Sequence, residues 1–283
     1  MTELLNDNII IDGHRIACGV HGKGEPVILI HGTPSHSYIW RNVVPKLVAA
    51  ECRVHLFDLL GFGASERPQD PEVDTSVAAQ DAVLTNLMAY WRLESANIVS
   101  HDIGGAVGLR FGIFHPDLIR TLTVIDTVSY DSWPSITWQR IIADGLDSLM
   151  QAPRAEHRKR LTKQLKMVVH DKSIMKGAVL EAYLDAISGP IGQPSFFQHQ
   201  VRHYDSRYTA EIGDRLGELG RIPVQILWGG SDEWQPNSYA KRLAQDIPES
   251  ALHILPEAGH FLMEDKPEEV ADYIKGLLKP NQT

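Results

Sequence analysis

The sequence predicts an α/β fold in which a mainly parallel sheet is flanked by helices and carries a helical insertion. Short, continuously apolar segments alternate with segments of helical period along most of the 283 residues, which is typical of parallel strands joined by right-handed helical crossovers. The apolar segments have no polar alternation, so we expect strands buried on both faces. One long stretch in the middle of the chain has helical patterns but no such apolar segment.

The first half of the chain begins with a predicted hairpin, because residues 8–11 and 15–20 flank Asp12-Gly13, a strong turn signal. Apolar runs that end in glycine-containing turns predict buried strands at 26–31 and 53–58. The elements predicted next are a helix at 74–91 capped by Asp74 or Thr75, a strand at 96–100, a helix at 104–114 that stops before Pro116, and a strand at 122–125.

The stretch from 128 to 215 breaks the alternation. We interpret it as a helical lid inserted into a core domain formed by residues 1–127 and 216–283. Within the lid, Ser188–Pro194 has two glycines and two prolines and is expected to be a loop. The elements predicted after the lid are strands at 224–228 and 252–255 and helices at 238–244 and 267–278.

Composition excludes several classes of protein. Asp and Glu outnumber Lys and Arg by 36 to 27, so the chain lacks the basic surface that nucleic-acid binding requires. The apolar runs are far shorter than a membrane span, and the N-terminus has no signal-peptide pattern. The two cysteines, Cys18 and Cys52, are too few for a disulfide framework. We expect a cytoplasmic monomer or homodimer that acts on a small molecule, with no membrane or nucleic-acid partner.

The segment Ser100-His101-Asp102-Ile103-Gly104 carries the strongest chemical signal. It leads a predicted strand into a predicted helix through a tight turn, which is the layout of a nucleophile elbow with Asp102 at its tip. The N-terminus of the helix would keep that carboxylate ionised. An ionised carboxylate can attack carbon and form an ester intermediate.

Four motifs, each at the end of a predicted strand, then define a resemblance: His31-Gly-Thr-Pro34, Asp58-Leu-Leu-Gly-Phe-Gly-Ala-Ser65, Ser100–Gly104 and Ala258-Gly-His260. In this order the chain resembles the α/β-hydrolase superfamily across nearly its whole length. Within it, the chain is similar to the Asp-nucleophile branch of epoxide hydrolases and haloalkane dehalogenases. The resemblance implies a hydrolase with a helical cap and a catalytic triad.

The order of the triad along such chains is nucleophile, acid, histidine. The resemblance therefore implies that His260 is the general base and that Asp232, in Gly-Gly-Ser-Asp, orients its imidazole. Asp126, which ends the strand at 122–125, is the alternative triad acid. An oxyanion hole would be formed by the backbone N–H groups of Thr33 and Ile103.

Other residues are expected to line the substrate pocket or to have no part in chemistry. Pro34 follows Thr33 in the His-Gly-Thr-Pro turn, where a cis peptide would turn the Thr33 amide inward.

No His or Cys cluster has metal-ligand spacing and no phosphate-binding loop is present, so we expect neither a metal nor a cofactor. The expected pocket residues are His31, Pro34, Trp133, Trp138, Phe196, Phe197 and Phe261.

Opening an epoxide requires a proton donor, and the resembling epoxide hydrolases use lid tyrosines for this purpose. Tyr204 lies closest to the expected position before the acid loop. The other candidate donors in this lid are Tyr208, Tyr183 and His157. The position of a second, earlier tyrosine is not filled by a tyrosine here, and His157 is the nearest donor to it.

Alternatives remain at this point. A haloalkane dehalogenase would use the same Asp102, but the halide-binding Trp and Asn of the resembling enzymes are replaced by Ile103 and Thr33, which leaves Trp133 or Trp138 as donors. Fluoroacetate dehalogenases use two arginines where this chain has Ile103 and Ala106. A ligand-binding module that has kept the fold is a further alternative. We predict an epoxide hydrolase that forms an ester on Asp102 and hydrolyses it with water activated by His260.

Overall fold

The computed structural model describes residues 4–278; the first three and last five residues of the predicted core ranges lie outside it. Its eight-stranded sheet has the order β1-β2-β4-β3-β5-β6-β7-β8. Strand β2 is antiparallel to both of its neighbours, β1 and β4, and strands β3 to β8 are parallel to one another. The strands are β1 (Asp7–Ile11), β2 (His14–Gly22), β3 (Glu25–Ile30), β4 (Cys52–Phe57), β5 (Ala96–His101), β6 (Ile119–Ile125), β7 (Val224–Gly229) and β8 (Ala251–Leu255).

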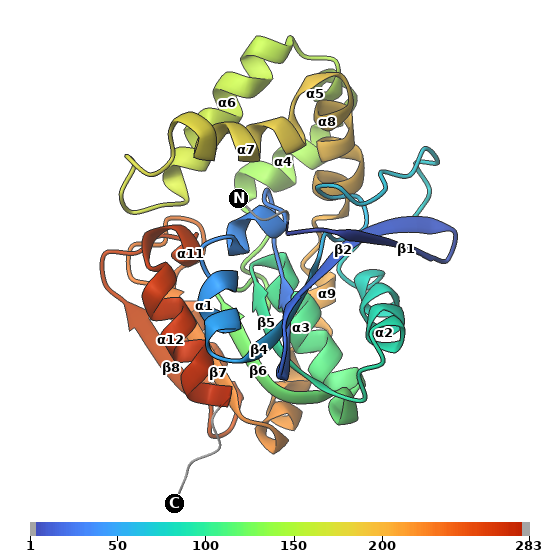
Figure 1. Cartoon of the computed structure of the whole chain (residues 1–283). Coiled ribbons are helices and arrows are strands. Elements are labelled where there is room, and N and C mark those ends of the chain that lie inside the picture. The colour runs from blue at the N-terminus through green and yellow to red at the C-terminus, as the bar shows by residue number, and fades with distance from the viewer. Residues whose placement is uncertain (1–3, 279–283) are drawn as a thin grey trace, which may run out of the picture.

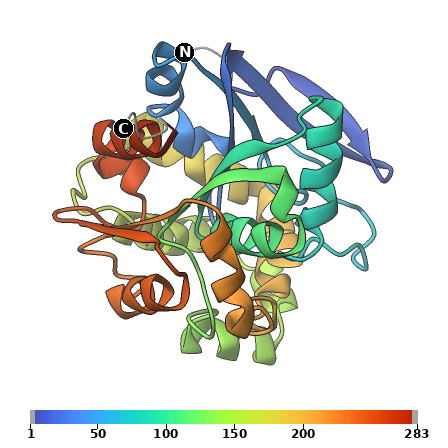
Figure 2. The ribbon, with the colours of Figure 1, turned by 90° about the horizontal axis from the view of Figure 1, so that it is seen from below.

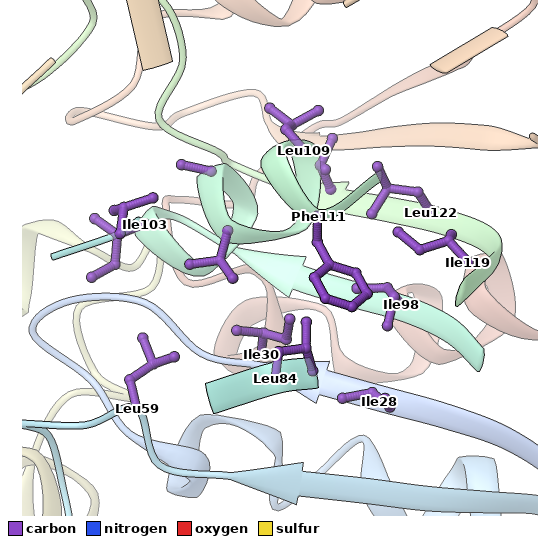
Figure 3. Close-up of a cluster of buried hydrophobic side chains, with 14 of the residues drawn as sticks. Ile28, Ile30, Leu59, Leu84, Ile98, Ile103, Leu109, Phe111, Ile119 and Leu122 are labelled. Atoms are coloured by element: carbon purple, nitrogen blue, oxygen red, sulfur yellow. The ribbon is translucent and has the colours of Figure 1, made fainter. Parts of the chain in front are cut away.

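Strand β3 is buried on both faces, as its apolar sequence predicts. Ile28 and Ile30 belong to the hydrophobic cluster on one face of the sheet, whereas Val27 and Leu29 belong to the cluster on the other. Complete burial of such a side chain contributes about 1.5–3 kcal/mol. In Figure 3, Phe111 points toward Ile98 of the neighbouring strand β5. Two hydrophobic layers therefore fix the sheet, and with it the positions of the loops at its carboxyl edge.

Helices cover both faces of the sheet (Figure 2). One face packs against α1 (Val44–Ala49) and α12 (Pro267–Leu278), and the other packs against α2 (Gln80–Tyr90), α3 (Ile103–Phe114) and α10 (Asn237–Asp246). The short helix α11 (Leu262–Asp265) precedes α12. None of the helices within residues 4–278 combines the length and the apolar character that crossing a membrane requires.

The region between β6 and β7 is a helical insertion without a strand of its own in the part of the chain that the structure describes. In Figure 1, α4 to α8 gather beyond one end of the sheet, and α9 lies beside α3. The predicted limits of this lid, 128 and 215, stay a prediction. The inserted helices are α4 (Ile136–Asp144), α5 (Asp147–Met150), α6 (Arg154–Met167), α7 (Gly177–Ile187), α8 (Gly189–Ser195) and α9 (Arg207–Ala210), with short helical turns at Phe196–Gln200 and Val201–His203.

Two local predictions were wrong. Helix α2 begins at Gln80 and not near Asp74, because the Gln80 side chain holds the preceding loop by donating to the carbonyl oxygens of Leu60 and Thr75. The predicted loop at 188–194 is largely helix α8, with Pro190 in its first turn. A proline is tolerated there because a first-turn N–H has no intrahelical acceptor.

Candidate active site

The turn between β5 and α3 holds Asp102 in a strained conformation, with φ of 55° and ψ of −120°. Such a backbone costs on the order of 1–3 kcal/mol in a residue with a side chain. The helix can approach only because its first turn contains glycines: a Cβ at Gly104 would lie 2.2 Å from the carbonyl oxygen of His31, and one at Gly105 would lie 2.1 Å from Thr127 Oγ1. The turn therefore has the tight geometry that its sequence predicts.

The carboxylate of Asp102 is buried and held at both oxygens. Its Oδ1 accepts a 2.7 Å hydrogen bond from the backbone N–H of Thr33, and its Oδ2 lies 3.4 Å from Nε2 of His260. Burial alone would raise the pKa of Asp102, but the hydrogen bond and positive charge of His260 together with the Thr33 N–H hold that pKa below its usual value. Asp102 is thus ionised at neutral pH, as a carboxylate nucleophile must be.

His260 lies between two carboxylates. Its Nδ1 forms a 2.9 Å hydrogen bond with Oδ2 of Asp232, whose other oxygen accepts the backbone N–H groups of Trp234 and Gln235. Burial opposes the charged imidazolium, but Asp232 and Asp102 raise the pKa of His260 well above its usual value. The three side chains therefore form a carboxylate–imidazole–carboxylate array, in which the two carboxylates favour the charged imidazolium.

Asp126 lies beside this array without joining it. Its Oδ1 accepts the backbone N–H of Gly229 at 2.7 Å, and its side chain is fully buried. Burial, followed by the charge of Asp232, raises the pKa of Asp126 well above its usual value, since two adjacent buried carboxylates cannot both be ionised. The structure thus places Asp232, and not Asp126, in hydrogen-bond contact with His260.

Asp126, Asp232 and His260 also carry ligand atoms that lie within 4.8 Å of one another, a spacing that a metal ion could use. Asp232 and His260, however, face each other directly in a hydrogen bond. Binding of a cation would have to break that contact and would compete with the proton on His260.

Two backbone N–H groups lie at the base of the site. That of Thr33 is already bonded to Asp102, and the Thr33–Pro34 peptide is cis, as predicted. That of Ile103 is in the first residue of α3, where helix geometry provides no intrahelical acceptor. Both positions are those that the sequence predicts for an oxyanion hole.

A largely apolar cavity opens above Asp102. Four predicted pocket residues, Pro34, Trp133, Trp138 and Phe196, line it. Tyr204 also lines it and places its hydroxyl 2.6 Å from Thr33 Oγ1. Burial raises the pKa of this tyrosine, so the hydroxyl keeps its proton at neutral pH. The other lining residues are Val128, Ser132, Pro134, Ser135, Gln164, Val168, Trp234 and Gln235, with Thr33, Asp102, Ile103 and His260 at the base.

The other three candidate proton donors do not line this cavity. The hydroxyl of Tyr183 donates to Glu264 at 2.5 Å, and that of Tyr208 accepts from Arg207. His157 donates from Nε2 to the carbonyl oxygen of Ile187. These three groups therefore have partners elsewhere in the lid and core, and of the four candidate donors Tyr204 is the one that lines the cavity.

Three predicted pocket residues pack behind the cavity wall. His31 is fully buried and accepts the backbone N–H of Leu59. The ring of Phe197 packs edge-to-face against that of Phe196, with ring centroids 5.1 Å apart. Phe261 packs against the ring of His260. These residues support the lining side chains and do not contact the cavity.

Among the residues of the site that sequence reasoning missed, three have polar groups close to the proposed chemistry. Trp234 and Gln235 follow Asp232 directly, and this adjacency to the acid loop was a usable signal. Gln200 hydrogen-bonds Thr33 Oγ1 at 3.1 Å. It precedes Tyr204 by four positions, a spacing that would place two residues of a helix on one face.

Comparisons with known proteins agree with this architecture. A family model described as the alpha/beta hydrolase fold matches residues 25–267. A cis-3-alkyl-4-alkyloxetan-2-one decarboxylase of Shewanella oneidensis is 24% identical over 283 residues, covering 96% of this chain and 87% of that protein. A soluble epoxide hydrolase of Corynebacterium sp. is 26% identical over 292 residues, covering 96% of each chain. A crystal structure of an alpha/beta hydrolase fold protein from Burkholderia ambifaria has a TM-score of 0.85 and 29% identity, covering 97% of this chain and 98% of that one.

The fold and these matches define an enzyme of the hydrolase fold. The chain belongs to the alpha/beta hydrolase fold family. The resemblance that the four sequence motifs predict is confirmed at the level of this superfamily. Membership of its Asp-nucleophile branch stays a prediction.

Proposed function

We propose that the protein is an epoxide hydrolase that converts an epoxide to a vicinal diol through an ester on Asp102. The observation that carries this proposal is the shared contact at Thr33. Its backbone N–H bonds the carboxylate of Asp102, and its side-chain oxygen bonds the hydroxyl of Tyr204. A nucleophile and a proton donor therefore face one apolar cavity, and ring opening needs both.

In the first step, a carboxylate oxygen of Asp102 attacks a ring carbon of the epoxide. The carbon–oxygen bond of the ring breaks, and its electron pair goes to the ring oxygen, which takes the proton of Tyr204. The products are an alkyl ester of Asp102 that carries a hydroxyl group, and a tyrosinate. General-acid assistance of this kind contributes about 10²- to 10⁴-fold.

Formation of the ester changes the charge around His260. Asp102 loses its negative charge and so no longer helps to raise the pKa of His260. His260 can then give its proton to the tyrosinate and act as a neutral base. In the second step it takes a proton from water, whose oxygen attacks the ester carbonyl, and the Thr33 and Ile103 N–H groups stabilise the oxyanion. The bond between the carbonyl carbon and the alkyl oxygen then breaks, the leaving alkoxide takes the proton of the new carboxyl group, and release of the diol regenerates the Asp102 carboxylate with His260 protonated.

The cavity supports an epoxide over a haloalkane. A departing halide needs N–H donors and no proton, but Ile103 follows the proposed nucleophile. The indole N–H of Trp133 donates to Thr209 Oγ1 at 2.9 Å and is directed away from this role. Trp138 and Trp234 are then the remaining indoles on the cavity wall. The relative from Corynebacterium sp., named a soluble epoxide hydrolase, also supports this choice.

The test is the intact mass of His260→Gln after exposure to an aryl epoxide and, separately, to a panel of haloalkanes. Without its base the enzyme should stall at the ester, so the mass should rise by that of the whole epoxide. A rise by the alkyl group alone, with free halide, would assign dehalogenation instead. The double variant Asp102→Ala/His260→Gln is the control and should gain no mass from either panel.

A further inference from the structure

Thr33, Tyr204 and Gln200 form a hydrogen-bonded chain at the cavity wall. The hydroxyl oxygens of Thr33 and Tyr204 lie 2.6 Å apart, and Thr33 Oγ1 donates to Oε1 of Gln200 at 3.1 Å. A threonine hydroxyl has a single proton. Since Thr33 gives that proton to Gln200, Tyr204 must donate in the contact between the two hydroxyls. The free enzyme therefore holds the Tyr204 proton in a defined direction.

The surroundings leave this hydroxyl little freedom. The Tyr204 ring packs edge-on against Trp133 and Trp138, each with ring centroids 6.0 Å away. Gln200 is buried, with 3% of its surface exposed. A phenolate formed in such an apolar site needs a nearby hydrogen-bond donor, because its charge is otherwise poorly solvated.

Thr33 can supply that donor by rotating one bond. Its proton points to Gln200 in the free enzyme, and it can turn to Tyr204 once Tyr204 has given its own proton away. The polar groups that face Tyr204 from the cavity base are Thr33 and the carboxylate of Asp102. The carboxylate disfavours a second negative charge nearby, and the Thr33 hydroxyl favours one.

We propose that the Thr33 side chain is a positioning residue that holds the Tyr204 hydroxyl at the cavity wall until an epoxide takes its proton, and then stabilises the phenolate left after ring opening. This inference rests on the proposed epoxide hydrolase function. It separates two roles of one residue: the Thr33 side chain acts in ring opening, whereas its backbone N–H acts on the carboxyl group of Asp102 in ester hydrolysis.

Thr33→Val removes the hydroxyl but keeps the β-branched shape and the backbone N–H, and Thr33→Ser keeps the hydroxyl. Both are made in the His260→Gln background, where the ester accumulates and its rate of formation can be followed by quenched-flow intact mass. We expect Thr33→Val to slow ester formation by about 10- to 100-fold, the value of one hydrogen bond to a charged group. Thr33→Ser should stay within about threefold of the parent.

A double-variant comparison separates this role from general damage to the site. If the Thr33 side chain acts through Tyr204, adding Thr33→Val to Tyr204→Phe should cause no further slowing. Thermal unfolding checks that each variant folds, and Thr33→Ala replaces Thr33→Val if the valine does not. With a normal His260, the ester of Thr33→Val should decay at the parent rate, because the backbone N–H remains.

The outcomes are distinct. Unchanged ester formation in Thr33→Val, failure of Thr33→Ser to restore the rate, or additive effects with Tyr204→Phe would each overturn the role of Thr33. Absence of any epoxide adduct on the His260→Gln parent would overturn the proposed function itself, and the role of Thr33 with it.

Discussion

Asp126 and Asp232 follow the neighbouring parallel strands β6 and β7, yet the structure gives only Asp232 a hydrogen bond to His260. Asp232 accepts three hydrogen bonds, from His260 and from two backbone N–H groups. Asp126 accepts one, from Gly229. Burial and the neighbouring charge of Asp232 raise the pKa of Asp126 well above its usual value, and a single hydrogen bond to its charged form does little to oppose them.

Asp232→Asn should therefore reduce kcat on an epoxide by about 10³-fold or more, since the imidazole loses both its orientation and its compensating charge. Asp126→Asn keeps an acceptor for Gly229 and should remain within about tenfold of the parent. Steady-state kinetics of the parent and both variants on one epoxide measures the two changes in kcat. The reverse ranking would make Asp126 the triad acid.

Asp102→Ala should abolish turnover while leaving the cavity able to bind a ligand, because Asp102 lies at its base and the aromatic wall is untouched. Calorimetric titration with the diol product measures the binding. Full retention of turnover in Asp102→Ala would instead mean that Asp102 is not the nucleophile. If the parent itself turned over no epoxide and no haloalkane, a ligand-binding module would be favoured.

Tyr183→Phe should reduce stability and spare activity. The Tyr183 hydroxyl bonds Glu264, which also pairs with Arg41 through two hydrogen bonds. Loss of one hydrogen bond to this buried carboxylate should lower the free energy of unfolding by about 1–3 kcal/mol. Urea unfolding measures that change, and kcat should stay within about twofold. A fall in kcat with unchanged stability would return Tyr183 to the list of proton donors.

The contribution of His260 to stability should depend on pH in a defined direction. Because the folded protein raises its pKa, the contribution is fully present below the unfolded pKa of about 6.5 and is lost as pH rises through the folded value. Asp102 has the opposite sign: its contribution is present above about pH 3.9 and is lost as pH falls through its lowered folded pKa.

The difference in unfolding free energy between the parent and His260→Gln should accordingly be greater at pH 6 than at pH 10. Urea unfolding of both proteins at each pH measures it. A difference that does not change with pH would mean that folding leaves the pKa of His260 unshifted, and a smaller difference at pH 6 would mean that His260 is neutral in the folded protein. Either result would overturn the charge arrangement inferred for the resting site.

The sheet and the positions of the proposed triad could be predicted because they depend on local signals. Apolar runs mark the strands, and each proposed functional residue of the core directly follows one of them. Asp102 lies at a turn whose glycines are visible in the sequence, and His260 and Asp232 follow from chain order. Parallel strands bring all these turns to one edge of the sheet.

The contacts of the lid could not be predicted in this way. Helical periodicity gives the buried face of a helix but not the partner that it meets. Tyr183 reaches Glu264, 81 positions away, and Thr33 reaches Gln200, 167 positions away. Sequence position favoured Tyr204 but left four candidate donors open, and tertiary packing places Tyr204 alone among them at the cavity. The late start of α2 has the same origin, since Gln80 bonds to a distant loop.

The strand order reverses at β3, which pairs with β4 on one side and β5 on the other. The turns after β3 and β5 therefore meet, which puts Thr33 against Asp102. The proposed nucleophile, base and acid come from the sheet scaffold, whereas Tyr204, Trp133, Trp138 and Phe196 come from the insertion between β6 and β7. Changes in the insertion would therefore alter which molecules enter and how the departing oxygen is protonated, without moving the groups proposed to cleave the ester.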